Sequence, residues 1–146
     1  MQIRTMQIED YDAVFALWKS CSGMGLNDID DSRSGIERFL QRNPATCLVA
    51  VEETAIIGAI LVGSDGRRAY IYHTAVAPER QKQGIGSQLV QAAKKAVQKI
   101  GIAKMALVVF SRNQSGNAFW EKQGFCVRED LTYRNLALQE MTRMDT

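Results

Sequence analysis

One stretch of the chain, residues 70–101, constrains the fold most, because it combines a strand, a glycine-containing loop and a long amphipathic helix. Residues 70–77 are rich in aromatic and β-branched side chains, and Pro78 ends the strand because it has no backbone N–H to donate. Over residues 84–100, apolar side chains recur with helical spacing on one face: Ile85, Leu89, Ala93, Ala96, Val97 and Ile100. Gly101 is placed to end this helix. The stretch therefore predicts a strand followed by an amphipathic helix.

The loop between this strand and this helix is the candidate binding feature. Residues 80–86, RQKQGIG, combine positive charge with two residues that lack a Cβ. Glycine lets the backbone approach a ligand closely, and the first turn of a helix presents free N–H groups and partial positive charge. These properties favour a phosphate group at the loop. An ordinary charged connection between strand and helix is the alternative, which the residues leave open.

Motif matching narrows the interpretation of this loop. The chain has no G-x-x-x-x-G-K-[ST] string, and Leu89 stands where a dinucleotide fingerprint needs its third glycine. Residues 81–86, QKQGIG, instead match the Q/R-x-x-G-x-G/A pattern of the GNAT superfamily of N-acetyltransferases. Residues 113–125, NQSGNAFWEKQGF, also resemble that family's N…A-x-[YW]-E-K-x-G-F block. With both motifs in matching order, the chain resembles a GNAT protein over nearly its whole length.

Composition bounds the class of protein. The chain has 146 residues, 46% hydrophobic and 23% charged, which is ordinary for one folded domain over residues 1–146. A net charge of +2, without a basic run interleaved with aromatic residues, predicts no nucleic-acid partner. The longest apolar run, residues 55–63, is too short to cross a bilayer, and the first ten residues lack a signal-peptide core. We therefore expect no membrane association and a cytoplasmic location.

The cysteines and the histidine argue against a metal centre. Cys21, Cys47 and Cys126 are odd in number and widely spaced, so they predict no disulfide framework and suit a reducing compartment. No C-x-x-C pair occurs, and His73 is the only histidine. We therefore expect no metal and expect each cysteine to be a small packing residue. A cysteine nucleophile would need His73 as its base.

The whole pattern predicts an α+β domain. Its expected elements are an edge strand at 2–7, a helix at 9–21, a loop at 22–31, a helix from Ser32 or Ser34 to 42, strands at 46–51, 55–62 and 70–77, a helix at 84–100, a strand at 104–110, a helix at 115–123 and closing strands at 125–128 and 131–138. The strands on either side of the long helix should be parallel. The fold class is a single-domain GNAT-like α+β fold. Its central sheet is mixed and mostly antiparallel, with one parallel βαβ unit and helices on both faces.

The resemblance implies that acetyl-CoA is the cosubstrate and that it lies on the strand, loop and helix described above. In the family, the pantetheine arm pairs with the backbone of the central strand, which here corresponds to Ala75, Val76 and Ala77. The pyrophosphate lies on the loop and the helix start, which here are Gln81, Lys82, Gln83, Gly84, Ile85, Gly86 and Ser87. The implied coenzyme site also includes Asn113, Asn117 and Trp120. Asn113 is also suited to cap the helix that follows it, and Trp120 to pack in the core.

The reaction that the resemblance implies is direct attack of a neutral amine on the thioester. It needs a base for the amine, a donor for the oxyanion and an acid for the leaving thiolate. The backbone N–H near Val76 is the expected oxyanion donor. Many relatives have a tyrosine where this chain has Trp120, and an indole N–H cannot act as a proton-transfer acid. Tyr133 or Tyr72 could replace that tyrosine, or the thiolate could leave with solvent assistance.

His73 is the candidate base, because imidazole titrates near neutral pH. It lies three residues before Val76 on the central strand. A structural histidine with satisfied hydrogen bonds is the alternative interpretation. Strict alternation puts His73 and Ala75 on one face of the strand and Tyr72, Thr74 and Val76 on the other.

The acceptor is expected to be a primary amine on a small molecule or at a peptide N-terminus. Three aspartates in the 22–31 loop favour a cationic acceptor. Glu52 and Glu53 are further candidate bases, because strand-end carboxylates line acceptor pockets in relatives. The resemblance also allows a homodimer. A non-catalytic acyl-CoA-binding sensor or partner-binding domain is the alternative function, supported by Trp120 in place of tyrosine.

Overall fold

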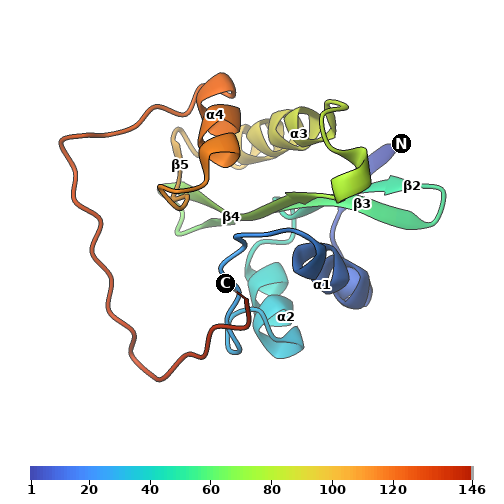
Figure 1. Ribbon diagram of the computed structural model, residues 1–146, viewed down its shortest axis with the longest axis horizontal. Helices are drawn as coiled ribbons and strands as arrows, with labels where there is room; N and C mark the ends of the chain where they lie inside the picture. The colour runs from blue at the N-terminus through green and yellow to red at the C-terminus, as the bar shows by residue number, and fades with distance from the viewer. Residues whose placement is uncertain (146) are drawn as a thin grey trace.

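One mixed β-sheet carries the helices of this protein, whose computed structural model describes residues 1–145 (Figure 1). The elements along the chain are β1 (Gln2–Thr5), η1 (Ile8–Asp10), α1 (Tyr11–Ser20), α2 (Arg33–Arg42), β2 (Leu48–Glu52), β3 (Ala55–Ser64), β4 (Ala69–Val76), η2 (Pro78–Arg80), α3 (Ile85–Lys99), β5 (Met105–Leu107) and α4 (Gln114–Lys122). The sheet order is β1-β2-β3-β4-β5, and only β4 and β5 are parallel. The expected α+β class with one parallel βαβ unit is confirmed.

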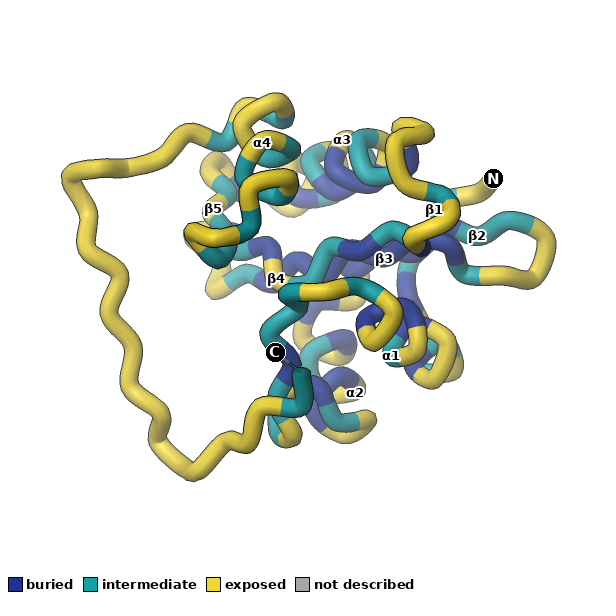
Figure 2. The backbone as a smooth tube through the Cα atoms, viewed as in Figure 1, coloured by how far each residue is buried: buried dark blue, intermediate teal, exposed yellow. Residues whose placement is uncertain are grey.

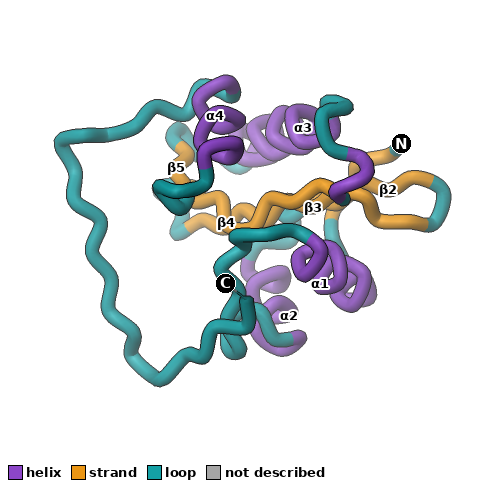
Figure 3. Tube along the Cα trace, in the orientation of Figure 1, coloured by secondary structure: helices purple, strands orange, loops and turns teal. Residues whose placement is uncertain are grey.

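The sheet separates two hydrophobic cores. Helices α1 and α2 cover one face, where Val14, Trp18 and Ile36 are buried. Helix α3 covers the other face, as the apolar periodicity predicts, and α4 lies on the same side (Figure 3). The buried residues of α3 are Ile85, Leu89, Val90, Ala93 and Val97. The expected placement of helices on both faces is therefore confirmed.

Helix ends follow the local sequence. Ser32 is the N-cap of α2, and its Oγ accepts the N–H of Gly35 at 3.0 Å. At the other end of the fold, Gly101 adopts φ +85° just after α3, and its N–H donates to the carbonyl of Gln98 at 3.0 Å. Both signals are visible in the sequence, so the boundaries of these helices differ from the expected ones by only one or two residues.

Strand β4 contains a β-bulge. Its register with β3 passes from Val62 opposite Ile71 to Ile60 opposite Thr74, so β4 advances three residues where β3 advances two. The extra residue changes the alternation of side chains between the two faces. The part of β4 that follows the bulge is the part that bears the expected site.

Because of the bulge, Tyr72 and His73 both face the helices α1 and α2. The ring of Tyr72 packs edge-on against Phe39 with centroids 5.5 Å apart, and the ring of His73 packs against Trp18 at 4.8 Å. Ala75 is buried in the same core. The expectation that His73 and Ala75 share a face is confirmed. The expectation that Tyr72 lies on the opposite face is wrong, because strict alternation ignores the bulge.

The C-terminal part also differs from the expectation. Strand β5 spans three residues rather than the predicted 104–110, and residues 125–128 and 131–138 form no strands. Figure 2 shows the chain after α4 running outside the body of the protein, and every residue from 126 to 143 is exposed. Strands need neighbours for their backbone hydrogen bonds, and residues 126–141 make none with other backbone groups of residues 1–145. Residues 125–138 have the apolar pattern of strands, but no strand of the described chain lies beside them to pair with.

Candidate active site

The N-terminus of α3 presents a row of free backbone N–H groups. The first hydrogen bond of the helix runs from the N–H of Gln88 to the carbonyl of Gly84 at 3.0 Å. The N–H groups of the three preceding residues, Ile85, Gly86 and Ser87, therefore lack partners in the helix. The loop before them makes two left-handed turns, with φ of +64° at Lys82 and +85° at Gly84. This is the geometry of an anion-binding helix start.

The two glycines at this helix start have different structural roles. A Cβ at Gly84 would meet nothing within 4 Å, so the space above it is open. A Cβ at Gly86 would lie 3.2 Å from the ring of Phe119 on α4, so Gly86 allows α4 to pack against α3. The Oγ of Ser87 accepts a hydrogen bond from the side chain of Gln123 at 2.8 Å. The helix start is therefore open on the Gly84 side and closed on the α4 side.

The end of β4 beside this loop has an uncovered edge. Pairing between β4 and β5 ends at Ile71 and Leu107, although β4 continues to Val76. The N–H of Ala77 donates to Ile57 on β3 at 2.9 Å. Successive residues direct their backbone groups to opposite sides of a strand, so Val76 directs its own toward the uncovered edge. The carbonyl of Val76 accepts from the side chain of Gln81 at 3.1 Å. Its N–H faces the open edge.

A buried His–Asp pair lies on the α1–α2 side of β4. The Nε2 atom of His73 is 2.6 Å from Oδ1 of Asp31, and the two side chains are only 13% and 4% exposed. The other oxygen of Asp31 accepts the backbone N–H of Asn27 at 2.9 Å. A carboxylate only accepts hydrogen bonds, so Nε2 carries the proton and Nδ1 is left as the acceptor. The sequence predicts Asp31 only as one of three loop aspartates that suit a cationic acceptor, and its pairing with His73, 42 positions away, was not predicted.

Helix α1 lines the same region. The indole of Trp18 is completely buried against His73, and its Nε1 has no hydrogen-bond partner among residues 1–145. One turn later, the Sγ of Cys21 lies 3.5 Å from the carbonyl of Val76. Burial raises the pKa of the Cys21 thiol, which therefore stays protonated and suits a packing role. The C-terminus of α1 thus links the His–Asp pair to the end of β4.

Two charged residues of the expected site are engaged with each other. The guanidinium of Arg80 makes a bidentate contact with Glu52, with N–O distances of 2.5 and 3.0 Å. The hydrogen bond from Arg80 lowers the pKa of the Glu52 carboxyl. Glu52 is therefore a poor proton acceptor, and part of the positive charge of Arg80 is neutralised. Lys82 is exposed next to the helix start, which leaves it as the loop cation without such a partner in the described chain.

The residues of the second motif lie on or beside α4. Asn113 is the N-cap of α4 and accepts the N–H of Gly116 at 2.9 Å. Asn117 donates to the carbonyl groups of Phe110 and Asn113, at 3.1 and 2.7 Å. The ring of Trp120 packs between those of Phe119 and Phe125, with centroid distances of 5.0 and 5.3 Å. All three expected residues therefore have structural contacts in the α4 region.

The tyrosines considered as acids lie on different segments. Tyr72 lies at the bulge of β4. Burial raises the pKa of its phenol, and the negative charge of Asp30 raises it further. Burial also raises the pKa of Tyr70 to about 12, with a further contribution from the nearby Tyr133 hydroxyl. Tyr133 itself is 65% exposed on the segment outside the body. It is therefore within electrostatic reach of β4 without packing against it.

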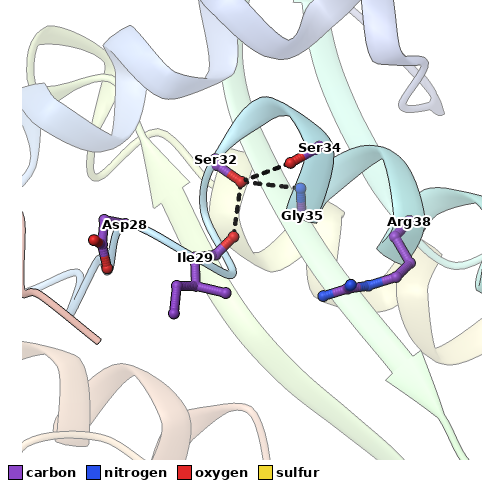
Figure 4. Close-up of a pocket in the computed structure, with 6 residues that line it drawn as sticks. All are labelled: Asp28, Ile29, Ser32, Ser34, Gly35 and Arg38. Atoms are coloured by element: carbon purple, nitrogen blue, oxygen red, sulfur yellow. Dashed lines mark hydrogen bonds between the residues drawn. The ribbon is translucent and has the colours of Figure 1, made fainter. Parts of the chain in front are cut away.

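A hollow of about 380 Å³ lies beside the connection between α1 and α2 (Figure 4). Ser32 caps α2 there and donates to the carbonyl of Ile29 at 2.8 Å. Asp28 and Arg38 lie on opposite sides of the hollow (Figure 4). None of the residues expected to bind coenzyme lines it. It lies instead next to the loop that carries Asp31.

Residues 1–145 were also searched for a metal centre and for a membrane-spanning helix. They contain no cluster of three or more His, Cys, Asp or Glu side chains that could hold a metal ion. They also contain no helix that is both long and apolar enough to cross a lipid bilayer.

Comparisons with solved structures give the class of fold. The PaiA N-acetyltransferase of Thermoplasma acidophilum, solved with coenzyme A, superposes with a TM-score of 0.76, 24% identity, and coverage of 87% of this chain and 90% of that chain. An aminoglycoside acetyltransferase from an uncultured soil metagenomic sample, solved with sisomicin, gives a TM-score of 0.71, 18% identity, and coverage of 94% and 96%. The fold is that of N-acetyltransferases.

Sequence comparison gives the family. The model of the acetyltransferase (GNAT) family matches residues 11–125. An acetyltransferase of Pectobacterium atrosepticum is 32% identical over 122 residues, covering 84% of this chain and 85% of the relative. The chain belongs to the GNAT family, as its two motifs predicted, and is an acetyl-CoA-dependent N-acetyltransferase by class.

Proposed function

We propose that this enzyme transfers the acetyl group of acetyl-CoA to a primary amine by direct attack within a ternary complex. The observation that carries the proposal is the juxtaposition of two open backbone features. The free N–H groups at the start of α3 follow directly on the uncovered edge of β4 at Val76. One suits a pyrophosphate and the other an extended amide-bearing arm, and coenzyme A contains both.

The residues present fit such a ligand. The pyrophosphate would lie on the backbone of Gln81, Lys82, Gln83, Gly84, Ile85, Gly86 and Ser87, where Gly84 leaves open space. The pantetheine arm would follow Ala75, Val76 and Ala77. Within that group Val76 supplies the free edge, because the N–H of Ala77 is bonded to β3. Asn113, Asn117 and Trp120 on α4 would form the other side of the arm's site.

We assign the base to His73. Its Nε2–H is held by Asp31, so its Nδ1 is the atom that can take a proton from the amine or through a water molecule. Asp31 is therefore a positioning residue for this reaction. The backbone N–H of Val76, which faces the open edge of β4, is the proposed oxyanion donor.

We assign the acid to Tyr133, with Tyr72 as the alternative. The Tyr133 hydroxyl lies close enough to β4 to influence Tyr70 and Tyr72. Phe in place of Tyr133 should lower kcat without changing the affinity for coenzyme A. Unchanged kcat in that variant, with a loss in the Tyr72→Phe variant, would move the assignment to Tyr72.

A small cationic amine is the proposed acceptor. Asp28 and Asp30 are exposed on the loop before α2, and Asp30 is near enough to Tyr72 to raise its pKa. These carboxylates would attract an ammonium group toward the His–Asp pair. One structural neighbour is named an aminoglycoside acetyltransferase and another a ribosomal-protein-S18-alanine N-acetyltransferase, so the preference for a small acceptor rests on the loop carboxylates and not on the neighbours.

Binding of coenzyme A tests the proposal before the acceptor is known. A ligand at about 100 times its Kd stabilises a fold by about 2.7 kcal/mol, which a thermal shift readily detects. Acetyl-CoA and coenzyme A should both raise Tm, and ATP and NAD should not. The absence of a shift with coenzyme A would refute the proposed site.

The matched variants are Gly84→Glu and Gly66→Glu. Both glycines have φ near +90°, and a Cβ added to either would meet nothing within 4 Å, so the backbone strain of about 1–2 kcal/mol should be similar. Only Gly84 lies at the proposed pyrophosphate site. The Gly84 variant should lose the coenzyme-induced shift, and the Gly66 variant should retain it. A panel of amines then measures thiol release, and binding without turnover on every amine would favour the sensor function.

A further inference from the structure

Residues 142–145, here called the C-terminal segment, lie against the loop between α1 and α2 (Figure 1). The two pieces of chain run antiparallel. The N–H of Met144 donates to the carbonyl of Leu26 at 2.9 Å, and the N–H of Asp28 donates to the carbonyl of Thr142 at 3.0 Å. The side chain of Asp28 accepts the N–H of Thr142 in return, at 2.7 Å. The C-terminal segment therefore holds the loop that supplies the buried carboxylate of the proposed site.

Asp145 adds two hydrogen bonds to this contact. Its Oδ1 accepts the N–H of Leu26 at 2.6 Å, and its Oδ2 accepts the N–H of Gly25 at 3.1 Å. Both backbone groups of Leu26 are thus bound by the C-terminal segment, and the residue is only 1% exposed. Hydrogen bonds to a carboxylate are stronger than those between neutral groups, so Asp145 is a strong anchor for this part of the loop.

Asn27, the next residue of the loop, connects this anchor to Asp31. Its backbone N–H donates to Oδ2 of Asp31 at 2.9 Å, and its carbonyl accepts the N–H of Asp31 at 3.3 Å. Its side-chain oxygen accepts the N–H groups of Ile29 and Asp30 at 3.0 and 2.8 Å. The turn that ends at Asp31 is therefore built around Asn27, whose place is set by the neighbouring Leu26.

The orientation of the Asp31 carboxylate depends on this turn. One of its oxygens is bound to Asn27, and the other lies 2.6 Å from Nε2 of His73. The turn belongs to the connection between α1 and α2, residues 21–32, where Gly25 adopts φ of +74°. A loop with glycine at such a position has many alternative conformations, so its contacts with the C-terminal segment select one of them.

We propose that Asp145 is a positioning residue for the acetyl transfer, because it fixes the loop that holds Asp31 against His73. The inference rests on the proposed function, in which Nδ1 of His73 accepts the proton. When Asp145 no longer holds the loop, Asp31 no longer selects the form of the imidazole that is protonated at Nε2. Part of the protein then carries the proton on Nδ1, which cannot act as the base in that form.

Nuclear magnetic resonance of the imidazole nitrogens tests this inference without a substrate. The chain has one histidine, so the two nitrogen signals belong to His73 alone. In neutral imidazole the protonated and unprotonated nitrogens differ in chemical shift, so the spectrum reports the tautomer. The wild type should show the Nε2–H form alone, and Asp145→Asn should show both forms. The amide keeps the shape of the side chain but presents an NH₂ group to one of the two loop N–H groups.

Kinetics of the same variant test the role in the reaction. With an amine that the wild type acetylates, the kcat of Asp145→Asn should fall by about tenfold to 100-fold, because a small displacement of a catalytic group is costly. The increase in Tm with coenzyme A should be retained, since the proposed coenzyme site lies on β4 and α3, and its retention shows that the variant is folded. Asp145→Glu keeps the charge on a longer side chain and should give an intermediate mixture of tautomers, which tests the same point in a second variant.

Asp130→Asn is the matched control. Asp130 is an exposed carboxylate after α4, and it contacts Arg128, two positions away. This control should change neither the tautomer nor kcat. The Nε2–H form alone in Asp145→Asn would overturn the inference, and an inactive His73→Gln would then leave the proposed function standing. Both tautomers at unchanged kcat would instead refute His73 as the base, and with it the role of Asp145 in the reaction.

Discussion

Replacing Asp31 with Asn should destabilise the fold and couple strongly to substitution of His73. Asp31 accepts from two donors at once, His73 Nε2 at 2.6 Å and the N–H of Asn27 at 2.9 Å. Asparagine has one acceptor oxygen and one NH₂ group, so the charged acceptor is lost, and His73 would have to carry its proton on Nδ1 to accept from the NH₂ group. Because the side chain is only 4% exposed, water cannot replace the lost bond freely. The expected loss is about 1–3 kcal/mol in the free energy of unfolding.

Urea denaturation of four proteins measures the coupling. They are the wild type, Asp31→Asn, His73→Phe and the double variant. Phenylalanine keeps a ring against Trp18 but removes the donor to Asp31. Once that donor is gone, replacing Asp31 removes one hydrogen bond fewer. The sum of the two single losses in the free energy of unfolding should therefore exceed the loss in the double variant by about 1–3 kcal/mol.

Asp30→Asn is the control, because that neighbouring carboxylate is exposed and should change stability by less than about 0.5 kcal/mol. In kinetics, His73→Gln should lower kcat by about 100-fold or more and flatten the acid limb of the pH–rate profile. Asp31→Asn should lower kcat in the same direction. Additive losses of stability, within about 0.5 kcal/mol, would refute the reasoning that these two side chains act as a unit.

Three further outcomes follow from contacts remote from the reaction. Arg4 holds Asp10 in a bidentate contact that lowers the pKa of the Asp10 carboxyl. The contribution of this contact to stability is therefore present above about pH 4 and is lost as the pH falls further. In the Asp10→Asn variant, the free energy of unfolding should lack this part of its dependence on pH. Ser32→Ala removes the N-cap of α2 and should cost about 1 kcal/mol, measured as a lower urea midpoint at unchanged m-value. Burial raises the pKa of the Cys47 thiol to about 12, so a thiol reagent should label the exposed Cys126 in the native protein and reach Cys47 only on unfolding; rapid native labelling of Cys47 would contradict this.

The parts of the site that the sequence predicts are those built from backbone and local spacing. Gly84 and Gly86 mark a helix start with free N–H groups, because residues without a Cβ permit a left-handed conformation and close packing there. Pro78 marks the end of the strand, because it has no backbone N–H to donate. The amphipathic pattern of residues 84–100 likewise predicts α3 to within a residue at each end. Such information is local, and a single sequence contains it.

The parts that were missed depend on distant partners. The bulge in β4 places Tyr72 on the same face of the sheet as His73. It arises from the register with β3, and no residue in β4 indicates it. Asp31 reaches His73 across 42 positions, and Arg80 reaches Glu52 across 28. The predicted closing strands contain an apolar pattern without a neighbour, and a pattern cannot specify whether a neighbour exists.

The packing of Trp18 against His73 also gives the protein an internal spectroscopic probe. The chain has two tryptophans, Trp18 beside His73 and Trp120 on α4, near opposite sides of the proposed site. An imidazolium in contact with an indole quenches its emission by accepting an excited-state electron, and neutral imidazole does so far less. With Trp120→Phe, the emission of Trp18 would report the protonation of His73 directly, and without Trp18 the emission of Trp120 would report ligand arrival at α4. The two halves of a ternary complex could thus be followed separately in two single-tryptophan variants, with no label attached.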